Sequence, residues 1–130
     1  SIYFTEILNL LSAFPKESYK LVFDTAHMFA NGCYKSADFE FLFMKFKKYI
    51  QYVHFNGNMN YVYKMDKHCP MFSPDNKIKE WKELSSICSK MTDVIFVAEI
   101  TKEGSTWQEW EKFSNDFGFN IVPFNESLCI

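Results

Sequence analysis

Short apolar segments alternate with longer segments of helical periodicity along this chain, and this alternation constrains the fold more than any other feature. Strand-like runs occupy residues 20–23, 51–55, 93–98 and 120–124, and helical patterns cover residues 2–14, 37–50, 78–91 and 105–117. Strands that alternate with helices of this length are typical of βαβ units, which form a parallel sheet. The sequence therefore predicts an α/β fold.

Local signals refine this prediction at two places. Ser105 is the expected N-cap of the last helix, with Gln108 three residues later. Residues 56–75 are rich in Asn, Gly and Pro and predict a long loop between a strand and a helix. Loops of this length in a compact domain are usually functional or disordered.

Composition excludes several classes of protein. The 130 residues fit one compact domain, and 48% apolar with 23% charged residues is a globular balance. The sequence contains neither an apolar run near the ~20 residues of a membrane span nor a secretory signal, so we expect no membrane partner. The net charge of −2 argues against a strongly basic nucleic-acid module, although local basic surface depends on where the lysines lie.

The cysteines are Cys33, Cys69, Cys88 and Cys129, and their spacing contains no CxxC motif. Such a set does not resemble a disulfide framework. It predicts free thiols in a reducing compartment, which would be the cytoplasm, the nucleus, or a viral particle or replication site.

Three strand-like segments end in side chains that can bind metal: Asp24, His54 and Glu99. The carboxyl ends of parallel strands meet at one edge of a sheet, where functional residues collect. We therefore expect these three side chains to share one site.

Further ligands lie close by in the sequence. His27 follows Asp24 by three residues, and Asp66 precedes His68 by two, a spacing that points both side chains to one side of an extended segment. Each short motif alone occurs by chance, and His54 between Val53 and Phe55 is also typical of a core histidine. The occurrence of all these motifs together favours a metal centre. Their nitrogen and oxygen ligands suit zinc or manganese as hydrolytic ions.

Four motifs resemble those of the endonuclease IV family of apurinic/apyrimidinic endonucleases, which belongs to the xylose isomerase-like superfamily. FDTAHMFANG at 23–32 resembles the family's second metal motif, and VAEI at 97–100 resembles its late Leu-Glu-Thr strand. HFN at 54–56 and DKH at 66–68 resemble its His-Leu-Asn-Asp and Asp-Arg-His elements. The resemblance spans about residues 21–101 and implies that residues 1–130 are the C-terminal half of a (β/α)8 TIM barrel, with the N-terminal strands and ligands upstream.

The resemblance also implies a ligand set. The family holds three zinc ions, of which one complete and one partial set would be present here. The complete set would be His27, Asp66 and His68. The partial set would be Asp24, His54 and Glu99, which would act in catalysis through metal-bound hydroxide.

The activity implied is zinc-dependent hydrolysis of double-stranded DNA on the 5′ side of an abasic site, leaving a 3′-hydroxyl and a 5′-deoxyribose phosphate. Candidates for contact with the DNA are Tyr61, Tyr63, Lys64 and Lys67. No obligate protein partner is evident. The isolated 130-residue chain would be inactive, since upstream ligands are missing from it.

The sequence departs from the family outside the matched ligands. Gly57 replaces an Asp, Lys67 an Arg and Ile100 a Thr, and MFSPDNKI at 71–78 replaces a Gly-rich stretch. Two alternatives therefore stay open: a sugar isomerase or epimerase of the same superfamily, and a catalytically inactive half-barrel relic or interaction module. Four strands cannot close an eight-stranded barrel, so we expect the isolated chain to be unstable or associated.

Overall fold

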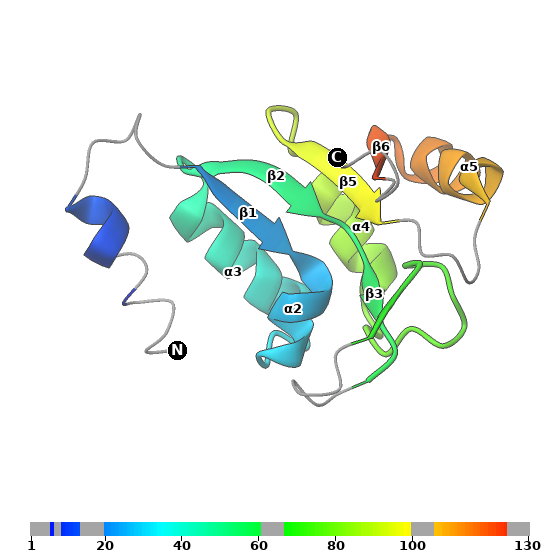
Figure 1. Ribbon diagram of the computed structural model, residues 1–130, viewed down its shortest axis with the longest axis horizontal. Coiled ribbons are helices and arrows are strands. Elements are labelled where there is room, and N and C mark those ends of the chain that lie inside the picture. Colours follow the sequence, from blue (N-terminus) through cyan, green and yellow to red (C-terminus); the bar gives the residue numbers. More distant parts are fainter. Residues whose placement is uncertain (1–5, 7–8, 14–19, 61–66, 100–105, 125–130) are drawn as a thin grey trace.

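A parallel sheet forms the centre of the computed structural model, which describes residues 6, 9–13, 20–60, 67–99 and 106–124. Its strands are β1 (Leu21–Asp24), β2 (Ile50–His54), β5 (Ile95–Glu99) and β6 (Ile121–Phe124). They lie side by side in the order in which they occur in the sequence, and every neighbouring pair is parallel (Figure 1). The predicted α/β fold with a parallel sheet is confirmed.

Helices occupy the connections between these strands. They are α2 (Thr25–Ala30), α3 (Ser36–Phe46), α4 (Trp81–Ser89) and α5 (Trp107–Phe117). Residues 9–12 are also helical, within the helix predicted over 2–14, most of which lies outside the described residues. Two short strands, β3 (Gly57–Asn58) and β4 (His68–Cys69), form a separate antiparallel pair within the segment predicted as a loop.

Several predicted boundaries are wrong. The helix predicted over 37–50 ends at Phe46, because a turn with the Tyr49 N–H donating to the Phe46 carbonyl leads into β2. The N-cap of α5 is Thr106 rather than Ser105. The Thr106 hydroxyl accepts from the Glu109 N–H, and the Glu109 carboxylate accepts from the Thr106 N–H, which is a capping box one residue later than predicted.

One face of the sheet packs against the helices. Its buried row across the four strands consists of Phe23, Val53, Phe96 and Ile121. Phe23 makes edge-to-face contacts with Phe43 and Phe46 of α3, with ring centroids 6.2 and 5.7 Å apart. In Figure 1, α3 and α4 lie behind the sheet, on this same side. The side chains between this face and the helices form the hydrophobic core.

The opposite face of the sheet is apolar but open among the described residues. Val22, Ile95 and Val122 are 52, 43 and 49% exposed, although they belong to strands. Side chains two residues apart share a face, so Asp24 lies on this face beyond Val22. Parallel sheets are normally covered on both faces. The candidate ligand Asp24 is therefore at the rim of an uncovered apolar surface.

This open face carries the first testable prediction. We expect residues 1–130 to self-associate in solution, because association removes exposed Val22 and Ile95 from water. Sedimentation velocity should show dimers or larger species, and Val22→Thr with Ile95→Thr should shift the population toward monomer. The matched control replaces Phe41 and Met44, which are 60 and 59% exposed on α3. A chain that stays monomeric at all concentrations would contradict the prediction. So would an equal shift toward monomer from the Val22 and Ile95 substitutions and from the Phe41 and Met44 substitutions.

The thiols are described at three of the four cysteines. Cys33, Cys69 and Cys88 are free thiols, and Cys129 lies outside the described residues. Burial raises the pKa of the Cys88 thiol far above its usual range, so this core thiol stays protonated. None of the helices in the described part of the chain has the length and apolar character needed to cross a membrane.

Candidate metal centre

Asp24 stands where β1 ends and α2 begins. Its backbone is extended, and its Oδ1 accepts a hydrogen bond of 3.1 Å from the His27 N–H, so the carboxylate is the N-cap of α2. Asp is among the preferred N-cap residues because its carboxylate satisfies one of the free N–H groups at a helix start. The short helix was missing from the sequence prediction, which treated DTAH as the end of a strand.

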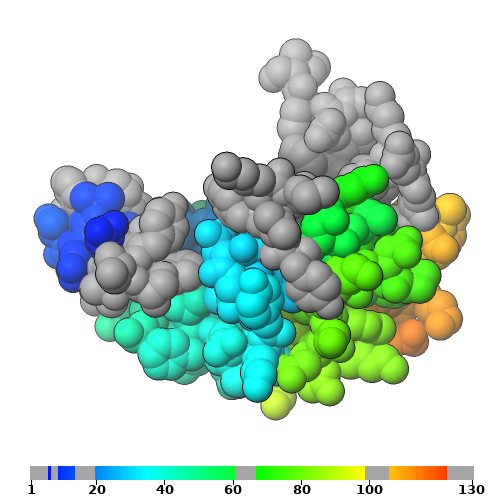
Figure 2. Space-filling model, turned by 90° about the horizontal axis from the view of Figure 1, so that it is seen from below, coloured from blue at the N-terminus to red at the C-terminus, as the bar shows by residue number. Residues whose placement is uncertain are grey.

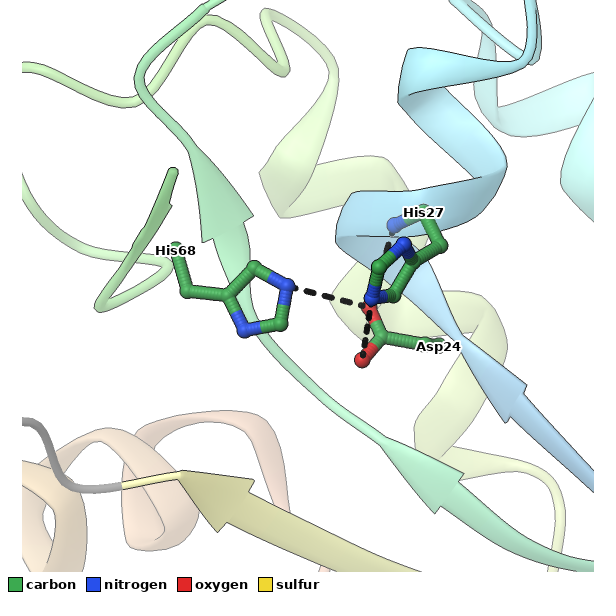
Figure 3. A group of neighbouring side chains, drawn as sticks. All are labelled: Asp24, His27 and His68. Atoms are coloured by element: carbon green, nitrogen blue, oxygen red, sulfur yellow. Dashed lines mark hydrogen bonds and ion pairs between the residues drawn. The ribbon is translucent and has the colours of Figure 1, made fainter. Parts of the chain in front are cut away.

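Three imidazole groups surround the Asp24 carboxylate. His27 Nε2 and His54 Nδ1 lie 3.9 and 3.7 Å from Asp24 Oδ2, and His68 Nε2 lies 3.9 Å from Oδ1. In Figure 3 the His68 ring points toward the Asp24 carboxylate from one side and the His27 ring lies over it. The centroids of the two rings are 5.1 Å apart and their planes are nearly perpendicular. The cluster thus gathers one carboxylate and three imidazoles.

These separations suit a shared metal ion better than direct hydrogen bonds. A direct N–H···O bond spans about 2.7 to 3.2 Å. Two ligand atoms that each lie about 2.0 to 2.2 Å from one tetrahedral zinc ion are about 3.4 Å apart. The carboxylate–imidazole distances of 3.7 to 3.9 Å exceed this separation by a few tenths of an ångström, and ligand atoms of Asp24, His27 and His68 all lie within 4.8 Å of one another, so small side-chain movements would bring them onto one ion. The donor set therefore fits zinc or manganese.

Sheet register and the β3–β4 pair bring these residues together. Asp24 and His54 are direct partners across β1 and β2. His68 starts β4, which is held against β3, and β3 in turn contacts α2. In Figure 2 the cyan surface around α2 adjoins the green surface of the segment that follows β4. Residues more than 40 positions apart in the sequence thus meet at one rim of the sheet.

The cluster is open on one side. The Asp24 side chain is only 12% exposed, whereas that of His27 is 55% exposed. His54 and His68 are intermediate. The imidazoles shield the carboxylate, and the cluster is accessible to solvent on the His27 side.

Ligands from both predicted sets lie together in the part of the chain that the structure describes. Asp24 belongs to one predicted set and His27 and His68 to the other, yet these three form one group. Glu99 ends β5, but its side chain is not described, and Asp66 lies outside the described residues. Among the DNA-contact candidates, Lys67 is described and exposed, while Tyr61, Tyr63 and Lys64 lie outside the described residues.

A polar network holds the segment between His54 and His68, and sequence reasoning missed it. The buried Thr25 hydroxyl donates to the Asn56 carbonyl at 2.6 Å and accepts from the Asn56 N–H at 2.8 Å. The Asn76 Oδ1 accepts from the Asn58 N–H, and its amide group donates to the Met71 carbonyl. The signal available was FNGNMN at 55–60, where Asn recurs at every second position directly after a strand.

Gly57 is required by this network for steric reasons. A Cβ at this position would lie 2.6 Å from Asn76 Cγ and Oδ1, closer than real Cβ contacts. Asn76 is itself held by the hydrogen bonds described above and by the Ile78 N–H. A side chain such as that of Asp therefore has no room at this position.

A cavity of about 430 Å³ adjoins His68 on the side of the 67–75 segment. Its lining includes Lys67, Phe72, Ser73 and Glu109. Cys69 also lines it, but burial, followed by the negative charge of Asp75, raises the pKa of its thiol to about 11. The thiolate is the metal-binding form of cysteine, so the neutral Cys69 thiol is a poorer ligand than the neighbouring imidazole.

The fold and the cluster together define a class: an α/β protein with a carboxylate–imidazole group at the carboxyl ends of parallel strands. Comparisons with models of known protein families, with curated proteins and with solved structures found no match.

Proposed function

We propose that this chain forms part of a metal-dependent phosphodiesterase of the endonuclease IV type, which cleaves DNA on the 5′ side of abasic sites. The observation that carries the proposal is the position of the Asp24 carboxylate, within 4 Å of the imidazoles of His27, His54 and His68. Motifs that resemble the family in order and spacing supply all four side chains.

The sheet topology supports the further proposal that the fold is half of a (β/α)8 barrel. In barrels, consecutive parallel strands are neighbours, whereas doubly wound sheets reverse their strand order. The order β1-β2-β5-β6 follows the sequence without reversal. The open apolar face with Val22 and Ile95 corresponds in character to a barrel interior, which branched side chains fill.

The cluster would hold the ion through Asp24, His27 and His68, with His54 beside the same carboxylate. The resemblance adds Asp66 and Glu99 to this set. When bound, zinc or manganese supplies Lewis-acid polarisation of a phosphoryl oxygen and lowers the pKa of water.

Lys67 directly precedes His68 and is exposed, so it is placed to neutralise a backbone phosphate near the cluster. Its ammonium group offers a point charge in place of the bidentate fork of an arginine. We therefore expect Lys67→Ala to weaken DNA binding while zinc binding is retained.

Incision of an abasic-site duplex tests the proposed function. The assay uses the longest natural polypeptide that contains these residues, loaded with zinc, because the family's barrel is about twice as long as this chain. The expected product carries a 3′-hydroxyl, and both a chelator and Asp24→Asn abolish it. A zinc-loaded protein that leaves the duplex intact would contradict the nuclease assignment and favour the isomerase or the inactive alternative.

A further inference from the structure

Asn58 lies at the junction of the two segments that carry His27 and His68. It is fully buried, with a relative exposure of 0%, although it is polar and follows directly after Gly57. In the antiparallel pair of β3 and β4, it is the direct partner of His68. A buried amide side chain needs hydrogen-bond partners, and those partners indicate its role.

One end of the Asn58 amide holds the helix that carries His27. The Nδ2 group donates to the carbonyl of Ala26 at 3.1 Å, and Ala26 immediately precedes His27 on α2. This bond joins residues 32 positions apart in the sequence. The neighbouring Thr25 is tied to Asn56 in a parallel way, so the start of α2 is fixed against the segment that follows β2.

The other end of the same amide holds the approach to His68. The Oδ1 atom accepts from the Asn60 N–H at 2.9 Å and from the Lys67 N–H at 3.4 Å, and Lys67 immediately precedes His68. The Met59 N–H donates to the Lys67 carbonyl at 2.9 Å and completes the pairing. A single side chain thus connects the residue before His27 to the residue before His68.

The backbone of Asn58 is itself anchored. Its N–H donates to Asn76 Oδ1 at 3.0 Å, and its carbonyl accepts from the Lys77 N–H at 2.6 Å. The amide therefore projects from a fixed point, and its two ends set the separation of the segments on either side. This geometry favours positioning over mere filling of space.

From this geometry we infer that Asn58 is a positioning residue, which holds His27 and His68 at the separation that one metal ion requires. The inference rests on the proposed metal site for its functional meaning. Partners beyond the direct ligands typically change metal affinity by about ten- to a hundredfold. Loss of the Asn58 amide should therefore weaken zinc binding by about that factor while His27, His68 and Asp24 remain intact.

The test compares Asn58→Ala with Ser85→Ala in the 130-residue chain. Ser85 is an equally buried polar residue, and its hydroxyl donates to the Trp81 carbonyl within α4, away from the cluster. Three measurements are made on each variant: zinc affinity by competition with a chromophoric chelator, the visible absorption of the Co²⁺ form, and the nuclear Overhauser effect between the His27 and His68 rings without metal. Thermal unfolding in chelator reports stability separately.

We expect Asn58→Ala to lower the zinc affinity, to change the absorption spectrum of the Co²⁺ form and to weaken the nuclear Overhauser effect between the His27 and His68 rings. Ser85→Ala should lower only the unfolding temperature. If Asn58→Ala does not fold, Asn58→Asp keeps the acceptor for Lys67 and loses the donor to Ala26, and the same changes are expected. Wild-type values in a folded Asn58 variant would overturn the positioning role. The wild-type chain could instead bind no zinc while Asn58→Ala still weakens the nuclear Overhauser effect between the His27 and His68 rings. That result would contradict the proposed metal site and support the positioning role.

Discussion

Zinc binding is expected to fall by more than about a hundredfold when Asp24 is replaced by Asn, because this carboxylate faces all three imidazoles of the cluster. Asn is as good an N-cap as Asp, so α2 keeps its capping hydrogen bond to the His27 N–H. The substitution therefore removes the negative charge and the second carboxylate oxygen without removing the cap. Equilibrium dialysis with zinc and elemental analysis measure the loss.

Stability gives a second measure of the same change. An ion present at about 100 times its Kd stabilises the folded state by about 2.7 kcal/mol. That zinc-dependent rise in the unfolding temperature should be present in the wild type and absent in Asp24→Asn. The matched control is Asp116→Asn on α5, which makes the same chemical change at an exposed ion pair with Lys112. Equal zinc binding by Asp24→Asn and the wild type would rule out the cluster as a metal centre.

Replacement of Gly57 by Ala is expected to destabilise the chain by about 3 kcal/mol, since the new methyl group meets Asn76 and displaces its buried hydrogen bonds. Displacement of Asn76 also frees Asn58, the direct strand partner of His68. We therefore expect zinc affinity to fall together with stability. Urea unfolding of the zinc-free chain measures the first effect, and chelator competition measures the second.

A double-mutant cycle identifies the cause of this destabilisation. In an Asn76→Ala background the obstructing side chain is gone, so Gly57→Ala should have little further effect on stability. Gly118→Ala serves as the contrast, because Gly118 has a positive φ of 73° but open space around its Cβ position. Gly118→Ala should lower the free energy of unfolding by about 1 to 2 kcal/mol, and by the same amount with or without the Asn76 side chain. Additive effects of Gly57→Ala and Asn76→Ala would contradict the steric account.

The sequence alone predicted the main architecture because periodicity is a local property. Runs such as DVIFVA at 93–98 and the helical spacing at 105–117 are readable over a few residues, and their alternation indicates a parallel sheet. The candidate ligands at strand ends followed from the same reasoning. Asp24 and His54 could be expected at one edge because parallel strands end together, and the register of β1 and β2 places them as direct partners.

The short elements α2, β3 and β4 were not predicted from the sequence. Helix α2 has six residues and starts at a capping Asp, so its sequence contains too few turns for a helical period. The strands β3 and β4 have two residues each and show no alternation that could distinguish them from a loop. In the structure β3 pairs with β4 and also contacts α2, so these short elements support one another.

What the sequence determined by itself is the α/β alternation and the set of side chains able to bind a metal ion. The tertiary structure decided which of the described ligands lie together: Asp24, His27 and His68 form one group. It also decided that Gly57 must lack a side chain and that Asn58 connects α2 to β4. The physical reason is that the Asn58–Ala26 hydrogen bond and the Gly57–Asn76 contact join residues 32 and 19 positions apart. Interactions between such distant positions leave no periodic pattern along the chain.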